Sequence, residues 1–222
     1  MKKVIIIFFF LPLLSFSSLE KCKNQVSFGD VIICMPEILN MTECYSNPTV
    51  KMFADLFKGT AGEEILGFFM SNNEYENLYS SLDNGLKEPY VKVYSTKLVK
   101  GINVSIKDLN TVSSGVKTTF DEYDGSNIES KINSRASDLN ISFGKPILLE
   151  EYELRPNIKS FVALMNFSAE QEGFIMVAVM NILIVKNRLI FIAYYDQYKN
   201  VKQIEKIKSN NDYFVLSMMA KN

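Results

Sequence analysis

The chain has 222 residues, 47% of them apolar, with 24 basic and 25 acidic side chains and no histidine. Charge this balanced, without a basic tract, leaves no electrostatic case for binding nucleic acid or an anionic membrane surface. Without histidine, the chain cannot use Ser-His-Asp or Cys-His catalysis and has little means to build most zinc, copper or non-haem iron sites. We therefore expect no cofactor and no metal site.

The first element is the three-part pattern of a cleavable signal peptide. The basic residues Lys2 and Lys3 precede an apolar run at positions 4–14, which is followed by small residues. This run is shorter than the roughly 20 residues that span a bilayer. Because small residues precede a cleavage site, the pattern predicts a cut after Ser17 or Ser18.

Cleavage would assign residues 1–18 to the signal peptide and residues 19–222 to a single exported domain, in the periplasm or outside the cell. An uncleaved membrane anchor and a lipid attached to Cys22 are the alternatives. Lipoprotein signals place small uncharged residues before the cysteine, whereas here Glu20 and Lys21 precede it. The lipoprotein alternative is therefore disfavoured.

Short strands and helices follow in the first two thirds of the chain, bounded by Gly, Pro and Asn. A capping-box pattern, Ser105 with Asp108, begins the longest helical stretch. A break at Asp124 and Gly125 makes that stretch two helices or one broken helix. The predicted elements are strand 26–35, helix 47–58, strands 64–70 and 90–99, and helices 105–123 and 126–139.

The last third is rich in strands and ends in a helical pattern. Its apolar stretch 174–195 is interrupted by Asn181 and by a Lys-Asn-Arg turn, which leaves pieces too short to span a membrane. Long strands covered on both faces explain it better. The predicted elements are strands 147–154, 161–167, 174–185 and 189–195 and a helix over 200–219, although Tyr213–Leu216 could also form a strand.

This order of elements is typical of an α+β domain with a mostly antiparallel sheet. It resembles the PsbP-like fold, the α-β-α sandwich of the photosystem II extrinsic protein PsbP and of bacterial envelope proteins of the DcrB type. The resemblance rests on the early strand ending in Cys34-Met35-Pro36, the strand meander from Phe161 to Tyr195 and the terminal helix. It covers most of the mature chain and implies binding or assembly rather than catalysis.

Three cysteines, Cys22, Cys34 and Cys44, lie near the start of the mature chain. An oxidising compartment predicts one disulfide and one remaining thiol. Cys34 ends an apolar strand pattern and Cys44 follows a short connection, so we expect a Cys34–Cys44 bridge, with Cys22–Cys44 as the alternative. No catalytic cysteine is expected, because no histidine can activate it.

Two features of the last strands are candidate sites. Tyr194, Tyr195, Asp196 and Tyr198 cluster at the end of the strand 189–195, where amphipathic rings could contact a partner. Asn181 lies alone in an apolar strand and needs hydrogen-bond partners, either from neighbouring segments or in a small polar cavity.

Acidic residues provide weaker candidates. Glu151 and Glu153 share one face of a predicted strand and could bind a cation or do acid–base work, but a solvated strand edge explains them better. The segment 121–125 lacks the alternating acidic positions of a calcium loop. We therefore predict no catalytic and no metal-binding residue.

The sequence thus predicts a non-catalytic exported module that binds an unidentified protein partner, and neither nucleic acid nor a membrane span after signal cleavage. Two alternatives remain open. The protein could bind a small apolar ligand between its sheet and helices, or act as a hydrolase of the serine-lysine type, which needs no histidine.

Overall fold

A computed structural model describes residues 22–222 apart from 61, 84–85, 87, 123–140 and 170–171. The predicted signal peptide and the predicted helix 126–139 lie outside these residues. The strands are β1 Gln25–Phe28, β2 Val31–Cys34, β3 Met41–Glu43, β4 Glu63–Ser71, β5 Tyr90–Thr96, β6 Ile141–Phe143, β7 Ile147–Arg155, β8 Ile158–Ala169, β9 Glu172–Val185 and β10 Arg188–Gln197. The helices are α1 Pro48–Leu56, α2 Asn72–Glu76, α3 Leu78–Asp83, the 3₁₀ turn Lys97–Val99, α4 Ile106–Asp121 and α6 Val201–Ala220.

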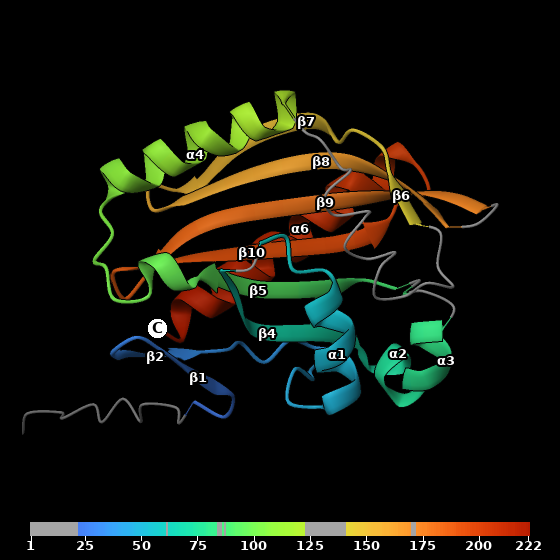
Figure 1. Ribbon diagram of the computed structural model, residues 1–222, viewed down its shortest axis with the longest axis horizontal. Coiled ribbons are helices and arrows are strands. Elements are labelled where there is room, and N and C mark those ends of the chain that lie inside the picture. Colours follow the sequence, from blue (N-terminus) through green and yellow to red (C-terminus); the bar gives the residue numbers. More distant parts are fainter. Residues whose placement is uncertain (1–21, 61, 84–85, 87, 123–140, 170–171) are drawn as a thin grey trace, which may run out of the picture.

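An eight-stranded antiparallel sheet forms the centre of the molecule (Figure 1). Its strand order is β3-β4-β5-β10-β9-β8, and both β6 and β7 pair with the outer edge of β8. A tight turn joins β9 to β10, where Lys186 and Asn187 have φ of 48° and 61°, the geometry of a two-residue hairpin. The predicted α+β class with a mostly antiparallel sheet is confirmed.

Helices cover both faces of this sheet (Figure 1). Helix α6 packs on β9 and β10, whereas α4 packs on the opposite face of β9 and α1 packs on β4. Side chains alternate along a strand, so Val179 of β9 belongs to the core under α6 while Ile182 belongs to the core under α4. Burial on both faces explains why β9 and β10 are almost continuously apolar.

Asn181 ties α6 to the sheet. Its side chain is 1% exposed and exchanges hydrogen bonds with Asn211 of α6, at 2.7 Å and 3.1 Å. Its Oδ1 also accepts from the Ser160 hydroxyl at 2.8 Å, and its Nδ2 donates to the Ile192 carbonyl at 3.2 Å. The structure therefore supplies partners for Asn181 from two neighbouring strands and a helix.

Some predicted elements differ from those in the structure. The single strand expected over 26–35 is a hairpin, because Gly29 at φ 66° turns the chain between β1 and β2. The short helices α2 and α3 and the short strands β3 and β6 were not predicted. In contrast, α6 is helical throughout, so the strand alternative at Tyr213–Leu216 is wrong.

Gly29 yields a stability prediction. A Cβ at this position would lie 2.2 Å from the Lys100 carbonyl oxygen, and the positive φ disfavours any L side chain. We expect Gly29→Ala to lower the free energy of unfolding by about 2 kcal/mol or more, measured by urea denaturation.

Gly115→Ala is the matched control. Gly115 lies within α4, and a Cβ there meets no atom within 4 Å. Alanine should therefore stabilise the helix by about 0.5–1 kcal/mol. Equal effects of the two substitutions would contradict the close approach at Gly29.

Candidate functional site

A cavity of about 350 Å³ lies over the sheet, bordered by residues of both α1 and α4. Helix α1 packs on β4 and α4 packs on β9, so the two strands between them, β5 and β10, are left to form its floor. We call this cavity the aromatic groove. Its rings are Phe53 and Phe57 of α1, Phe68 of β4, Tyr90 and Tyr94 of β5, Phe120 of α4 and Tyr195 of β10.

The floor of the aromatic groove is a row of stacked rings. Tyr90 and Tyr195 lie directly opposite each other on β5 and β10, with ring centroids 4.8 Å apart and planes at 19°. Phe68 extends the row on β4, with its centroid 5.7 Å from that of Tyr90. Burial raises the pKa of Tyr90 and of Tyr94 far above the usual value for tyrosine. These hydroxyls therefore stay neutral at physiological pH.

One buried ion pair also lines the aromatic groove. The ammonium group of Lys92 lies 3.0 Å from Oε1 of Glu63, and both side chains are at most 10% exposed. Lys92 also donates to the Phe57 carbonyl at 3.3 Å, and Oε2 of Glu63 accepts from the Gly59 amide at 3.0 Å. The Lys92 ammonium lies 4.5 Å from the centre of the Tyr94 ring. The pair is thus held by backbone groups that follow α1.

A second depression, of about 820 Å³, shares Glu63 with the aromatic groove and is lined mainly by charged residues. Four of its charged residues form two ion pairs, since Lys58 contacts Asp55 and Lys100 contacts Glu64, each at 2.7 Å. The aromatic groove is therefore the better candidate for a binding site, because it combines apolar walls with few polar groups.

The four residues of the expected partner patch do not form one surface. Tyr195 faces the aromatic groove, whereas its neighbour Tyr194 is buried in the core under α6, where Tyr198 also packs. Asp196 is 9% exposed and accepts a hydrogen bond from Gln203 of α6 at 3.0 Å. Burial raises the pKa of the Asp196 carboxyl and brings that of the Tyr194 hydroxyl to about 12.

The acidic residues of β7 pair with lysines. Glu151 contacts Lys117 of α4, and Glu153 contacts Lys159 of β8. Glu150 lies 2.7 Å from Lys208 of α6. These ion pairs join α4 and α6 to the edge strand β7. Each of the three carboxylates contacts a different lysine, so no two of them converge on a shared proton or cation.

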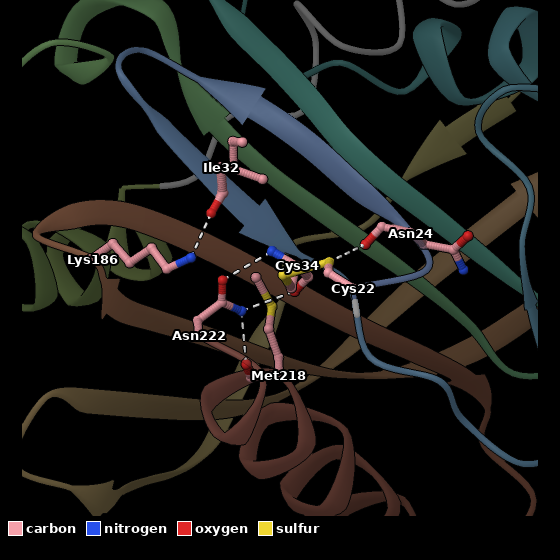
Figure 2. Close-up of a disulfide and its surroundings, with 7 residues drawn as sticks. All are labelled: Cys22, Asn24, Ile32, Cys34, Lys186, Met218 and Asn222. Carbon is pink, nitrogen blue, oxygen red and sulfur yellow. Dashed lines mark hydrogen bonds between the residues drawn. A yellow bond between two sulfur atoms is a disulfide. The ribbon is translucent and has the colours of Figure 1, made fainter. Parts of the chain in front are cut away.

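The cysteines pair differently from the expectation. Cys22 and Cys34 form a disulfide with a Cα–Cα distance of 5.6 Å, and Cys44 is a buried free thiol. Neither Cys34–Cys44 nor Cys22–Cys44 is present, because Cys44 lies in the core under α1 while Cys34 ends the β1–β2 hairpin. Figure 2 shows that the side chain of Asn222 binds the backbone of Cys34. It accepts a hydrogen bond from the Cys34 N–H and donates one to the Cys34 carbonyl, each with a donor–acceptor distance of 2.9 Å.

Sequence reasoning identified Tyr195 but missed the rest of the aromatic groove. A signal was present in β5, where Tyr90, Lys92 and Tyr94 alternate with valines. In a strand covered on both faces, a central lysine needs a buried partner. Its partner, Glu63, is 29 residues away in the sequence. Glu63 lies on the adjacent strand β4 opposite Thr96, four residues from Lys92, so the ion pair depends on strand pairing that the sequence pattern does not show.

Within the described ranges, no helix combines the length and the apolar character that crossing a membrane requires. The same ranges contain no group of three or more His, Cys, Asp or Glu side chains able to hold a metal ion.

No protein-family model matches the chain, and no curated protein sequence matches it. Among solved structures, it is similar to the Saccharomyces cerevisiae Ran-binding protein Mog1p, at 7% identity, over 86% of this chain and 87% of that chain. The TM-score is 0.37, too low for the likeness to indicate a function.

Cys44 provides a test of the cysteine pairing. Burial raises the pKa of its thiol to about 12, so about one molecule in ten thousand carries the reactive thiolate at pH 8. We expect no reaction of the native protein with Ellman's reagent at pH 8, and rapid release of one equivalent in urea. Peptide mapping without reductant should recover Cys22 joined to Cys34. Fast labelling of the native protein, or a Cys44 disulfide, would contradict this arrangement.

The buried ion pair yields a further prediction. Lys92→Met leaves the Glu63 carboxylate buried without its cation, which should cost about 3 kcal/mol in the free energy of unfolding. The double variant Glu63→Gln/Lys92→Met removes the charge and keeps an acceptor for Gly59, so most of that loss should be regained. Urea denaturation at pH 7 measures both variants, and equal losses would show that the charge is not buried.

Proposed function

We propose that the protein is an exported domain that binds a small, largely apolar molecule in the aromatic groove. The observation that carries this proposal is the cavity of about 350 Å³, which the described side chains line but do not fill. Cavities for small ligands begin at about 300 Å³ and have apolar walls with a few placed polar groups. The Glu63–Lys92 pair supplies such groups here.

This geometry favours ligand binding over the protein-binding role expected from the sequence. The groove is concave and mostly lined by apolar and aromatic side chains, with few polar groups, which is the form of sites for small molecules. The four residues expected to form a partner patch are instead divided between the two faces of the sheet, with Tyr195 in the groove and Tyr194 under α6.

The disulfide supports the export part of the proposal. Structural disulfides persist in oxidising compartments such as the periplasm and the cell exterior. The bond also bears on the lipoprotein alternative, because lipidation forms a thioether at the cysteine sulfur. A Cys22 sulfur bonded to Cys34 cannot carry a lipid.

Filling the groove from α4 tests the proposed function. Thr119 is exposed to solvent and lines the cavity, so Thr119→Trp should place an indole in the space for a ligand without disturbing the core. We expect binding of the fluorescent probe N-phenyl-1-naphthylamine to weaken at least tenfold, measured by fluorescence titration.

Thr118→Trp is the matched control, because Thr118 is the adjacent exposed residue and does not line the groove. Each threonine hydroxyl donates to the carbonyl four residues earlier, at 3.3 Å for Thr118 and 3.0 Å for Thr119, so the two substitutions perturb the helix alike. Equal probe affinity in the two variants would mean that the groove is not the binding site.

A further inference from the structure

The chemistry of the aromatic groove narrows the class of its ligand. Seven of the eighteen described residues that line it are aromatic, whereas aromatic residues make up 12% of the whole chain. These rings come from α1, β4, β5, β10 and α4, so they surround the cavity rather than form one wall. Aromatic pairs gain free energy beyond the area they bury when the rings are offset or meet edge to face. The lining therefore favours binding of a ligand that itself carries an aromatic ring.

Strand register shows where such a ring would lie. The row Phe68–Tyr90–Tyr195 continues across β9 and β8 to Ala178 and then Ala163. The stack of protein rings thus stops at Tyr195, because the next two positions carry methyl groups.

Two methionines lie on either side of these alanines. Met180 follows two residues after Ala178 on β9, and Met165 follows two residues after Ala163 on β8, and both line the groove. Methionine is flexible and makes favourable contacts with aromatic rings. Ala178 and Ala163 are themselves fully buried and are not among the residues that line the groove. A planar ring beside Tyr195 would therefore lie against the side chains of Met165 and Met180.

The charges of the residues that line the groove set a second condition on the ligand. Glu63 and Lys92 are the charged residues among the eighteen that line the groove in the described part of the chain, and they pair with each other. The charges of these two described residues sum to zero, so the described lining offers an ionised ligand no unpaired counterion. Moving an unpaired charge from water into apolar surroundings is strongly unfavourable.

We propose that the aromatic groove selects a neutral aromatic molecule, with one ring beside Tyr195 and any polar substituent directed to the Glu63–Lys92 pair. This inference rests on the proposed function and adds the chemical class of the ligand. It excludes fatty acids and aromatic acids as preferred ligands of the same cavity.

A matched pair of probes tests the condition on charge. N-phenyl-1-naphthylamine and 8-anilinonaphthalene-1-sulfonate share one ring skeleton and differ by a sulfonate. We expect the neutral probe to bind the full mature domain at least tenfold more tightly. Equal affinity, or tighter binding of the sulfonate, would overturn the inference that the ligand is neutral.

Substitution of Tyr195 tests the condition on the ring. Tyr195→Leu should weaken binding of N-phenyl-1-naphthylamine by about three- to tenfold, the range expected for the loss of one ring–ring contact. Tyr195→Phe keeps the ring and should restore the affinity. 1-Decanol is a neutral aliphatic competitor whose affinity can be measured by displacement of the probe. We expect both variants to bind 1-decanol with the same affinity, which would show that both are folded.

The outcomes separate the two proposals. If Thr119→Trp and Thr118→Trp affect the probes equally, the groove is not the binding site and the proposed function fails. If Thr119→Trp blocks binding but Tyr195→Leu and Tyr195→Phe bind the neutral probe alike, the groove remains a binding site and the aromatic preference is overturned. If 1-decanol binds the unsubstituted domain more tightly than the neutral probe, the aromatic preference is overturned as well.

Discussion

The pairing of β9 with β8 and β10 is the constraint on which the rest of the molecule depends. Side chains alternate along each strand, so a shift of one residue would exchange the contents of the two faces. In the observed register, Asn181 meets Ser160 and Ile192 under α6, while Tyr195 faces the groove opposite Tyr90. The hydrogen bonds between Asn181 and Asn211 then give α6 one position on the sheet. Any other register would bury this amide without its partners, at a cost of about 1–3 kcal/mol.

The two faces of the sheet are covered in different ways, and the aromatic groove is the result. One long helix, α6, lies along the central strands with the β1–β2 hairpin beside it, and the core between them is filled by residues such as Phe69 and Phe214, whose rings meet edge to face at 4.9 Å. On the other face, α1 and α4 pack on strands that are not neighbours. Among the described residues, the strands between them carry the rings and the ion pair that line the groove. That ion pair supplies polar groups to the groove without adding net charge to its described lining, and the proposal of a neutral ligand rests on this balance.

The N-terminal hairpin connects distant parts of the chain to the α6 layer. The disulfide closes its open end, and Asn222 binds the backbone of Cys34 from the end of α6 (Figure 2). At its other end, the guanidinium of Arg188 contacts Asp30 and donates to the Ile102 carbonyl at 3.1 Å. The close approach of Gly29 to Lys100 lies at the same end. The hairpin therefore contacts both the end of α6 and the β9–β10 turn, although it forms a separate sheet.

Local patterns in the sequence were sufficient for the α+β class, the long strands of the meander, the capping box of α4 and the terminal helix, because periodicity and caps act within a few residues. The same patterns also placed Asn181 within an apolar strand and Tyr195 among the candidate residues. They could not give the partners of Cys22, Lys92 or Asn181, since those partners are chosen by strand register and helix packing between segments far apart in the chain. The disulfide pairing was wrong for this reason, as Cys44 turns into the core under α1. The aromatic groove likewise depends on tertiary structure, because its described lining comes from two helices that pack on separate strands and from the strands between them.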